Sequence, residues 1–182
     1  MVQMDIRPAT EGDYPAVRDF YYALTDEMAD APYPPGMKKD IYPTQDFLKD
    51  SIRQGELYLG FLDGALAACM VVNHAYNEGY RAVAGGVEAA DDELLVIHAL
   101  GVRRACSGRG LAKAMARRVL QMARAQGLKT VRLDVLGSNL PAERAYTAVG
   151  CRQVAPPRIL DQATGGTAKK ACENHHSNPA AA

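Results

Sequence analysis

The 182-residue chain has no tryptophan and only three phenylalanines, and it carries no net charge, since 21 Lys and Arg residues balance 21 Asp and Glu residues. This balance excludes the strong overall field with which many proteins attract nucleic acid or anionic membranes. No run approaches the roughly 20 apolar residues that span a bilayer, and the N-terminus resembles neither a signal nor a transit peptide. We therefore expect a cytoplasmic protein without nucleic-acid or membrane partners, whose functional charges are local.

Cysteine is also scarce, and its spacing excludes the usual frameworks. Cys69, Cys106, Cys151 and Cys172 are scattered, and no two of them form a C-x-x-C pair. Structural metal sites and disulfide scaffolds need clustered spacing or a secreted context. We expect free, mostly buried thiols and no metal site. The segment CENHH at 172–176 is interpreted as part of a flexible polar tail rather than as a zinc site.

The remaining composition, with 48% hydrophobic and 23% charged residues, is typical of one globular domain. The apolar spacing predicts a strand, two helices, three strands, a helix, a strand, a helix and a strand. This order indicates a mixed α/β domain over residues 1–160. From residue 161 the chain is small and polar, so we expect 161–182 to be a flexible tail.

Local signals place these elements along the chain. Asp63-Gly64 joins two apolar runs and favours a tight hairpin turn. Thr44 is a helix cap and Gly127 a helix stop. The run 94–102 is apolar on both faces, as expected of a central strand covered by helices on each side. Helices are predicted at 13–28, 45–55, 112–127 and 139–150. A strand is predicted from residue 4 to Pro8, a two-stranded hairpin over 56–72, and further strands at 94–102, 129–137 and from 151.

A glycine-rich turn, Gly108-Arg109-Gly110, stands between the strand 94–102 and the next predicted helix. A strand, a glycine turn and a helix together present backbone N–H groups and a positive helix end to an anion. The turn is not a P-loop, because no Gly-Lys followed by Ser or Thr is present. Nor is it a dinucleotide-binding fingerprint, because Lys113 stands where the third glycine would be.

The stretch instead resembles the cofactor motif of the GNAT N-acetyltransferase superfamily, Gln/Arg-x-x-Gly-x-Gly/Ala after a strand ending in Leu-x-Val. The resemblance covers residues 4 to about 155. It implies a GNAT-like acyl-CoA N-acyltransferase fold, with a central, mostly antiparallel sheet flanked by helices, and acetyl-CoA as co-substrate. The matching residues are Leu100-Gly101-Val102 at the strand end, Ser107 to Ala112 in the turn, and Asn139, Ala142, Tyr146 and Gly150-Cys151 downstream.

The resemblance also implies how the cofactor binds. The strand end would pair with the pantetheine arm, and the amides of the turn would bind the pyrophosphate. Local positive charge is expected from Arg103, Arg104, Arg109 and Lys113; the alternative is that these residues only form a solvated face. Ser107 departs from the usual Gln or Arg, which we expect to weaken the phosphate contact. The implied cofactor-binding residues are Leu100, Gly101, Val102, Ser107, Gly108, Arg109, Gly110, Leu111, Ala112, Lys113 and Asn139.

Two residues are candidates for proton transfer. Tyr146 matches the family position that donates a proton to the coenzyme A sulfur; the alternative is an ordinary core tyrosine. His98 lies two residues before Leu100, where many relatives carry a glutamate, and an imidazole is a suitable base near neutral pH. Strand alternation predicts His98 on the same face as Val96, Leu100 and Val102. The alternative is a buried histidine satisfied by hydrogen bonds.

The acceptor site carries no transferable motif. Candidates for substrate contact are Tyr33, Glu78 and Tyr80 in loops and Asp134 on a strand, where pairing with an arginine is the alternative. The tail has few of the apolar residues with which relatives close the sheet, so a homodimer partner could cover that edge. We expect direct acetyl transfer from acetyl-CoA to a primary amine of a small molecule or amino acid. Acetylation of a protein N-terminus or lysine, and a non-catalytic acyl-CoA-binding module, are the alternatives.

Overall fold

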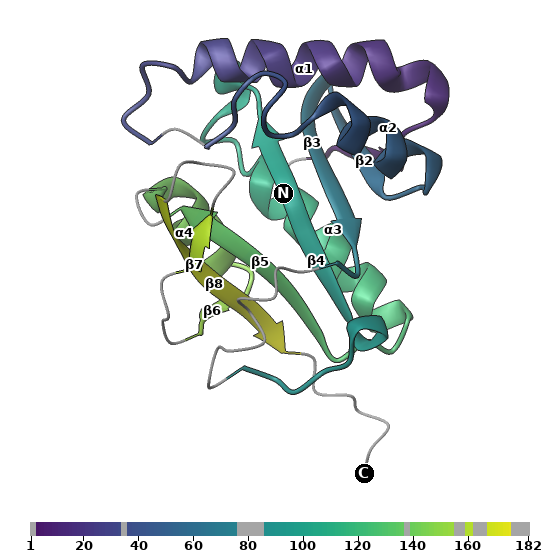
Figure 1. Cartoon of the computed structure of the whole chain (residues 1–182), viewed down its shortest axis with the longest axis vertical. Coiled ribbons are helices and arrows are strands. Elements are labelled where there is room, and N and C mark those ends of the chain that lie inside the picture. The colour runs from purple at the N-terminus through teal and green to yellow at the C-terminus, as the bar shows by residue number, and fades with distance from the viewer. Residues whose placement is uncertain are drawn as a thin grey trace.

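Eight strands form one sheet in the part of the chain that the computed structural model describes, residues 3–33, 36–75, 86–136, 139–154, 159–161 and 167–175 (Figure 1). The strand order is β1-β2-β3-β4-β5-β8-β6, and β7 also pairs with β8. β4 and β5 are parallel and their neighbours pair antiparallel. The strands are β1 (Asp5–Pro8), β2 (Leu57–Leu62), β3 (Ala65–Asn73), β4 (Leu94–Val102), β5 (Thr130–Leu136), β6 (Arg152–Gln153), β7 (Ile159–Asp161) and β8 (Thr167–His175).

Helices cover both faces of the sheet, as the apolar run 94–102 predicts. One buried layer joins α1 and α2 to the sheet, and the other joins α3 and α4 to it. In Figure 1, α1 crosses the upper end of the sheet and α3 lies behind it. No helix in the described ranges is long and apolar enough to cross a membrane. The helices are α1 (Tyr14–Glu27), α2 (Gln45–Arg53), α3 (Leu111–Ala125) and α4 (Leu140–Thr147), with short 3₁₀ turns η1 (Glu11–Asp13), η3 (Asp91–Glu93) and η4 (Arg104–Cys106).

The local start and stop signals of the sequence are confirmed. Asp63 and Gly64 form the β2–β3 turn, both with positive φ (52° and 79°). The Thr44 hydroxyl accepts a hydrogen bond from Phe47 N at 3.1 Å and caps α2. Gly127, at φ 69°, follows the end of α3. These short-range devices determine where elements begin and end without help from distant residues.

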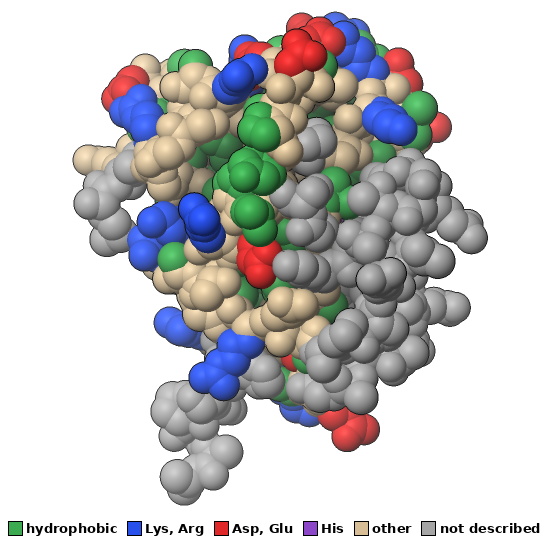
Figure 2. Space-filling model, turned by 90° about the vertical axis from the view of Figure 1, so that its left-hand side faces the viewer, with side chains coloured by type: hydrophobic (Ala, Val, Ile, Leu, Met, Phe, Trp, Pro, Cys, Tyr) green, Lys and Arg blue, Asp and Glu red, His purple; other side chains and the backbone are tan. Residues whose placement is uncertain are grey.

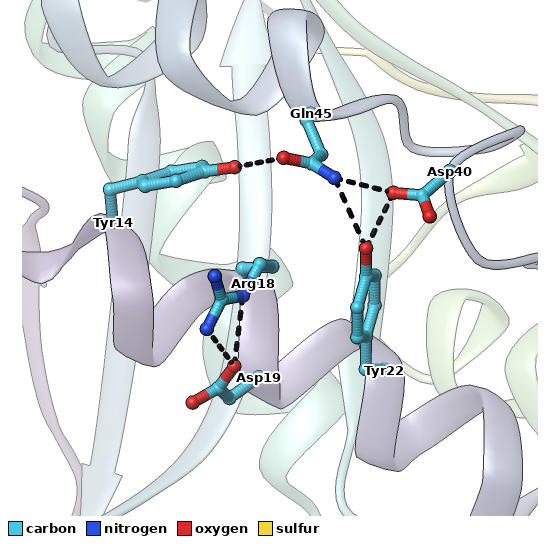
Figure 3. Close-up of polar contacts among 6 residues, drawn as sticks. All are labelled: Tyr14, Arg18, Asp19, Tyr22, Asp40 and Gln45. Carbon is cyan, nitrogen blue, oxygen red and sulfur yellow. Dashed lines mark hydrogen bonds and ion pairs between the residues drawn. The ribbon is translucent and has the colours of Figure 1, made fainter.

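α1 and α2 are joined by a polar cluster around the first residue of α2 (Figure 3). The Gln45 side chain accepts a hydrogen bond from the Tyr14 hydroxyl at 2.8 Å and donates one to Asp40 at 2.8 Å. Asp40 also accepts from the Tyr22 hydroxyl at 2.5 Å. Through these hydrogen bonds, the start of α2 is connected to α1 and to Asp40 in the loop between the two helices.

A bulge interrupts β4 at Ala99, whose φ is 49°. The pairing with β3 shifts by one residue here, from Val71 opposite His98 to Cys69 opposite Gly101. One inserted residue reverses which side chains face which layer. Ile97 therefore packs in the α3 layer, Ala99 in the α1 layer, and Leu100 in the α3 layer again.

Because of the bulge, His98 does not lie on the face of β4 that the sequence predicts. Its partner Val71 packs in the α1 and α2 layer, whereas Leu100 and Val102 pack against the α3 layer. The prediction that His98 shares a face with Leu100 and Val102 is therefore wrong. Strict alternation fails because Ala99 adds one residue between them.

The prediction that residues 161–182 form a flexible tail is also wrong for β8. This strand pairs antiparallel with all of β5, and Ala171, Cys172, Glu173 and Asn174 are buried. The sheet thus extends past the predicted domain boundary at residue 160, and its own chain covers the edge for which a partner copy was considered. Residues 176–182, including His176 of the CENHH segment, lie outside the described residues.

A buried ion pair explains how so polar a segment can lie in a sheet. The side chains of Arg132 on β5 and Glu173 on β8 are 9% and 3% exposed, and their atoms are in hydrogen-bond contact. Glu173 also accepts from Val87 N at 2.9 Å, and Arg132 donates to Val87 O at 2.6 Å. Buried charges persist when each is paired and hydrogen-bonded in this way.

Replacing one partner of this pair should destabilise the protein far more than replacing an exposed one. We expect Arg132→Met to lower the free energy of unfolding by about 3–5 kcal/mol, because it leaves Glu173 charged and unpaired. The double variant Arg132→Met/Glu173→Met should lose clearly less free energy of unfolding than Arg132→Met alone. Glu93→Gln, which breaks the exposed pair with Lys129, should cost less than about 1 kcal/mol. Urea denaturation measures all three, and equal losses for the Arg132 and Glu93 variants would contradict a docked β8.

Candidate active site

A cleft opens where β4 and β5 separate. The two strands pair from Leu94 to Ile97 on β4, opposite Thr130 to Leu133 on β5, and then diverge (Figure 1). The cavity there has a volume of about 550 Å³. It is lined by Leu24, Met28, Ala31, Pro32 and Tyr33, by Leu100, Gly101, Val102, Arg104, Cys106, Ser107, Gly108, Gly110, Leu111, Ala112 and Lys113, and by Asn139, Pro141, Ala142, Arg144, Ala145 and Tyr146.

The lining combines apolar walls with three cationic side chains, Arg104, Lys113 and Arg144. The face of the molecule in Figure 2 has the same character, with a central band of hydrophobic side chains beside a group of Lys and Arg side chains. Such a surface suits a long ligand with an apolar part and an anionic part.

One edge of β4 is exposed in this cleft. Val102 and Gly101 pair with Ala68 and Cys69 of β3 on one side, whereas pairing with β5 on the other side ends at Ile97. An open strand edge can hydrogen-bond to an extended ligand. Gly101 is needed because a Cβ there would lie 2.4 Å from a Leu24 methyl group.

The start of α3 is built for an anion. Gly108 and Gly110 have φ of 76° and 83°, values that a side chain disfavours, and Gly110 is the N-cap. It provides no side-chain cap, unlike Thr44 of α2 and Asn139 of α4. The first intrahelical bond is Ala114 N to Gly110 O, at 3.0 Å, so the preceding N–H groups are left for a ligand at the positive helix end.

The basic residues around this turn divide into two groups. Arg104 and Lys113 line the cleft, but the Arg109 side chain does not. It lies 3.7 Å from Asp63 of the β2–β3 turn and lines a separate groove between β1 and α3. The predicted cofactor residue Arg109 is therefore the one member of its set that is absent from the cleft lining. Arg144, on α4, also lines the cleft, although no motif of the sequence points to it; it precedes Tyr146 by two residues on the same short helix.

Glu27 at the end of α1 clamps the loop that leads into the turn. Its carboxylate accepts hydrogen bonds from the Arg103 guanidinium, at 2.7 Å from Nε, and from Arg104 N, at 3.0 Å. The Arg103 hydrogen bond lowers the pKa of Glu27. The charge of Arg103 is thus engaged by Glu27, contrary to its predicted contribution to an anion site.

Tyr146 lies at the inner end of the cleft, in the core layer of α3 and α4. It is 7% exposed, and its hydroxyl makes no hydrogen bond to the described residues. Burial, with smaller contributions from Cys151 and the Asp134 carboxylate, raises the pKa of Tyr146 above its usual range. The phenol therefore stays protonated at neutral pH and can only donate a proton.

His98 lies outside the lining of the cleft. Its Nε2 is 2.9 Å from Asn73 Oδ1, and its ring packs edge-on against Phe47, with centroids 6.4 Å apart. The Asn73 amide nitrogen donates to Glu56, which orients the amide oxygen toward His98. An amide oxygen accepts hydrogen bonds, so the side chain of Asn73 holds the imidazole of His98 through Nε2.

The predicted acceptor residues are only partly brought together. Tyr33 lines the cleft and is 37% exposed. Asp134 lies on the opposite face of β5 from Leu133 and Val135, as predicted, and is close enough to act on the pKa of Tyr146. Glu78 and Tyr80 lie outside the described residues.

Comparison with known proteins gives this architecture its class, the acetyltransferases. A sequence model of the Acetyltransferase (GNAT) family matches residues 19–151. The chain belongs to this family, and acetyl-CoA is its co-substrate. No curated protein sequence matches the chain.

Solved structures share the fold at low sequence identity. A GNAT-family acetyltransferase from Streptococcus agalactiae superposes with a TM-score of 0.76 at 21% identity, over 95% of each chain. AAC(6')-Ib, in complex with ribostamycin and coenzyme A, gives 0.68 at 17% identity, over 97% of this chain and 95% of its own. An agmatine N-acetyltransferase mutant gives 0.64 at 20%, over 95% and 99%.

The Glu27 clamp should be visible as a pH-dependent stability difference. Because its pKa is lowered in the folded state, its contribution is present above the unfolded pKa of about 4.3 and lost as pH falls through the folded value. We expect Glu27→Gln to cost about 1 kcal/mol at pH 7 and less at pH 3. Denaturation at both pH values measures this, with Glu11→Gln on the surface as control. A difference that does not vary with pH would show that the charge of Glu27 is not what holds the loop.

Proposed function

We propose that this protein transfers an acetyl group from acetyl-CoA to a primary amine of a small molecule. The observation that carries the proposal is the convergence of three features on one cleft: an uncapped helix start, an open strand edge and a protonated tyrosine. The substrates in the names of two similar structures, ribostamycin and agmatine, favour a small amine as acceptor.

The residues of the cleft fit coenzyme A in two parts. The N–H groups at Leu111 to Lys113 and the glycines before them suit the pyrophosphate. Gly110 has a positive φ, so a residue with a Cβ at this position would strain the turn that the pyrophosphate approaches. The open edge of Leu100 to Val102 suits the amide-bearing pantetheine arm, which can pair with it as a further strand. Ser107 and Asn139 also line the cleft, in keeping with their predicted places.

The transfer itself poses two proton problems. An alkylammonium with a pKa near 10 must lose a proton before its nitrogen can attack, at about 4 kcal/mol at pH 7. The neutral nitrogen then bonds to the thioester carbonyl carbon, the carbon–sulfur bond breaks, and the thiolate leaves. The nitrogen loses its second proton as the amide forms, which balances the proton that the thiolate takes up. We assign the proton donor for the thiolate to Tyr146. We assign the acceptor of the ammonium proton to His98, acting through water because this residue lies outside the lining of the cleft.

Two alternatives remain distinguishable by experiment. A protein N-terminal or lysine acetyltransferase would use the same cofactor cleft, and a screen of small amines against peptides separates the two acceptor classes. A non-catalytic acyl-CoA-binding module would bind the cofactor without turnover, which the Tyr146 variant below tests.

Acetyl-CoA binding should depend on the glycine turn. We expect saturable binding by calorimetry in the native protein. Gly110→Glu should weaken it at least about tenfold more than Gly110→Gln, because the two side chains differ mainly in the charge presented to the pyrophosphate. Equal losses would indicate a steric effect alone. Absence of binding in the native protein would contradict the proposed function.

Tyr146→Phe should separate chemistry from binding. We expect kcat to fall by about 10²-fold, the usual scale for a lost proton donor, while the Kd for acetyl-CoA stays within about twofold. Since burial raises the pKa of Tyr146, its deprotonation should cause no fall in native kcat below pH 10. An unchanged kcat in the variant would remove Tyr146 from the mechanism.

A further inference from the structure

The three tyrosines of α1 use their hydroxyls differently. Those of Tyr14 and Tyr22 bind Gln45 and Asp40, around the start of α2 (Figure 3). That of Tyr21 points to the sheet and donates to the carbonyl oxygen of Ala99 at 2.7 Å. Tyr21 and Ala99 are 3% and 7% exposed, so this bond is shielded from water.

The acceptor is the residue at which β4 is bulged. Ala99 has φ 49°, in the left-handed region that a residue with a Cβ disfavours. Such a conformation persists only where the surroundings impose it. Here the bulge turns the Ala99 carbonyl toward α1, where it accepts the hydrogen bond of the Tyr21 hydroxyl. Without that donor a carbonyl buried in this layer would lose its hydrogen bond.

The bulge is also what shapes the cleft. Pairing between β4 and β5 ends at Ile97, two residues before Ala99. From Leu100 onward the strand turns its side chains into the α3 layer and its free edge into the cleft. A relaxed bulge would reverse the orientation of Leu100 to Val102 and remove this edge from its position.

We propose that Tyr21 is a positioning residue for acetyl-CoA, whose hydroxyl holds the β4 bulge in the shape that accepts the pantetheine arm. It acts through the backbone of Ala99 and does not itself line the cavity. The inference rests on the proposed function, since it concerns the same cofactor site. Loss of the hydroxyl lowers the fraction of molecules in the binding-competent shape, and the apparent Kd rises by the same factor.

Four proteins test the proposal: the native chain, Tyr21→Phe, Tyr14→Phe and the double variant Tyr21→Phe/Ala99→Gly. Phe preserves the ring packing in both single variants, and Tyr14→Phe removes a comparable hydroxyl from the same helix. The double variant is the rescue, because glycine adopts positive φ without the penalty of alanine. Calorimetry gives the Kd for coenzyme A, thermal unfolding gives stability, and amide hydrogen exchange of residues 98–102 reports on the bulge without any ligand.

We expect Tyr21→Phe to raise the Kd by roughly 3- to 10-fold, the scale of one buried hydrogen bond, and to accelerate amide exchange at 98–102. Tyr14→Phe should change neither, and Ala99→Gly should restore most of the affinity in the Tyr21→Phe background. A native-like Kd and exchange in Tyr21→Phe would overturn the proposal. So would a weakened Kd that Ala99→Gly does not rescue, since that result describes general destabilisation.

The same set separates this inference from the proposed function. If the native protein does not bind coenzyme A, the proposed function fails and the exchange measurement alone decides the role of Tyr21 in the bulge. If the native protein binds and Tyr21→Phe binds equally well, the cofactor site stands and the role of Tyr21 is wrong.

Discussion

The one extra residue at Ala99 is the constraint on which the functional half of this structure depends. It lies two residues beyond the last pair of β4 with β5, at the point where the cleft opens. It also decides the placement of side chains on both sides of it, sending Leu100 to the α3 layer and His98 to the α1 and α2 layer. In a regular strand with the same residues, His98 and Leu100 would lie on the same face.

The first helix is the support for this arrangement. Its residues Phe20 and Leu24 pack where Gly101 has no side chain, Tyr21 binds the bulge, and Glu27 binds the loop that follows β4. These contacts come from successive turns of one helix, so the strand end and the glycine turn are held by a rigid element. A site positioned in this way keeps its geometry better than one formed by loops alone.

Because the protein has no net charge, any attraction for an anionic ligand depends on groups close to the cleft. Arg103 is paired with Glu27, and Arg109 lies toward Asp63, so the turn does not concentrate all its nearby cations on a ligand. Its attraction for an anion comes instead from backbone N–H groups at the positive end of α3, with Arg104, Lys113 and Arg144 around the cleft. These groups are the ones that would bind the proposed pyrophosphate in a neutral protein with Ser107 in place of the usual Gln or Arg.

The sequence by itself determined the elements whose signals are local. Thr44, Asn139, Asp63-Gly64 and Gly127 set helix and turn boundaries through bonds and φ values within a few residues, and the turn at Gly108 to Gly110 indicated an anion site for the same reason. Tertiary structure alone decided the rest. The polar strand β8 is held by a pair 41 residues apart, Arg132 and Glu173, and the bulge at Ala99 meets a hydroxyl 78 residues away. Neither the strand β8 nor the bulge can be recognised from the local hydrophobic periodicity, because each depends on a contact with a residue that is distant in the sequence.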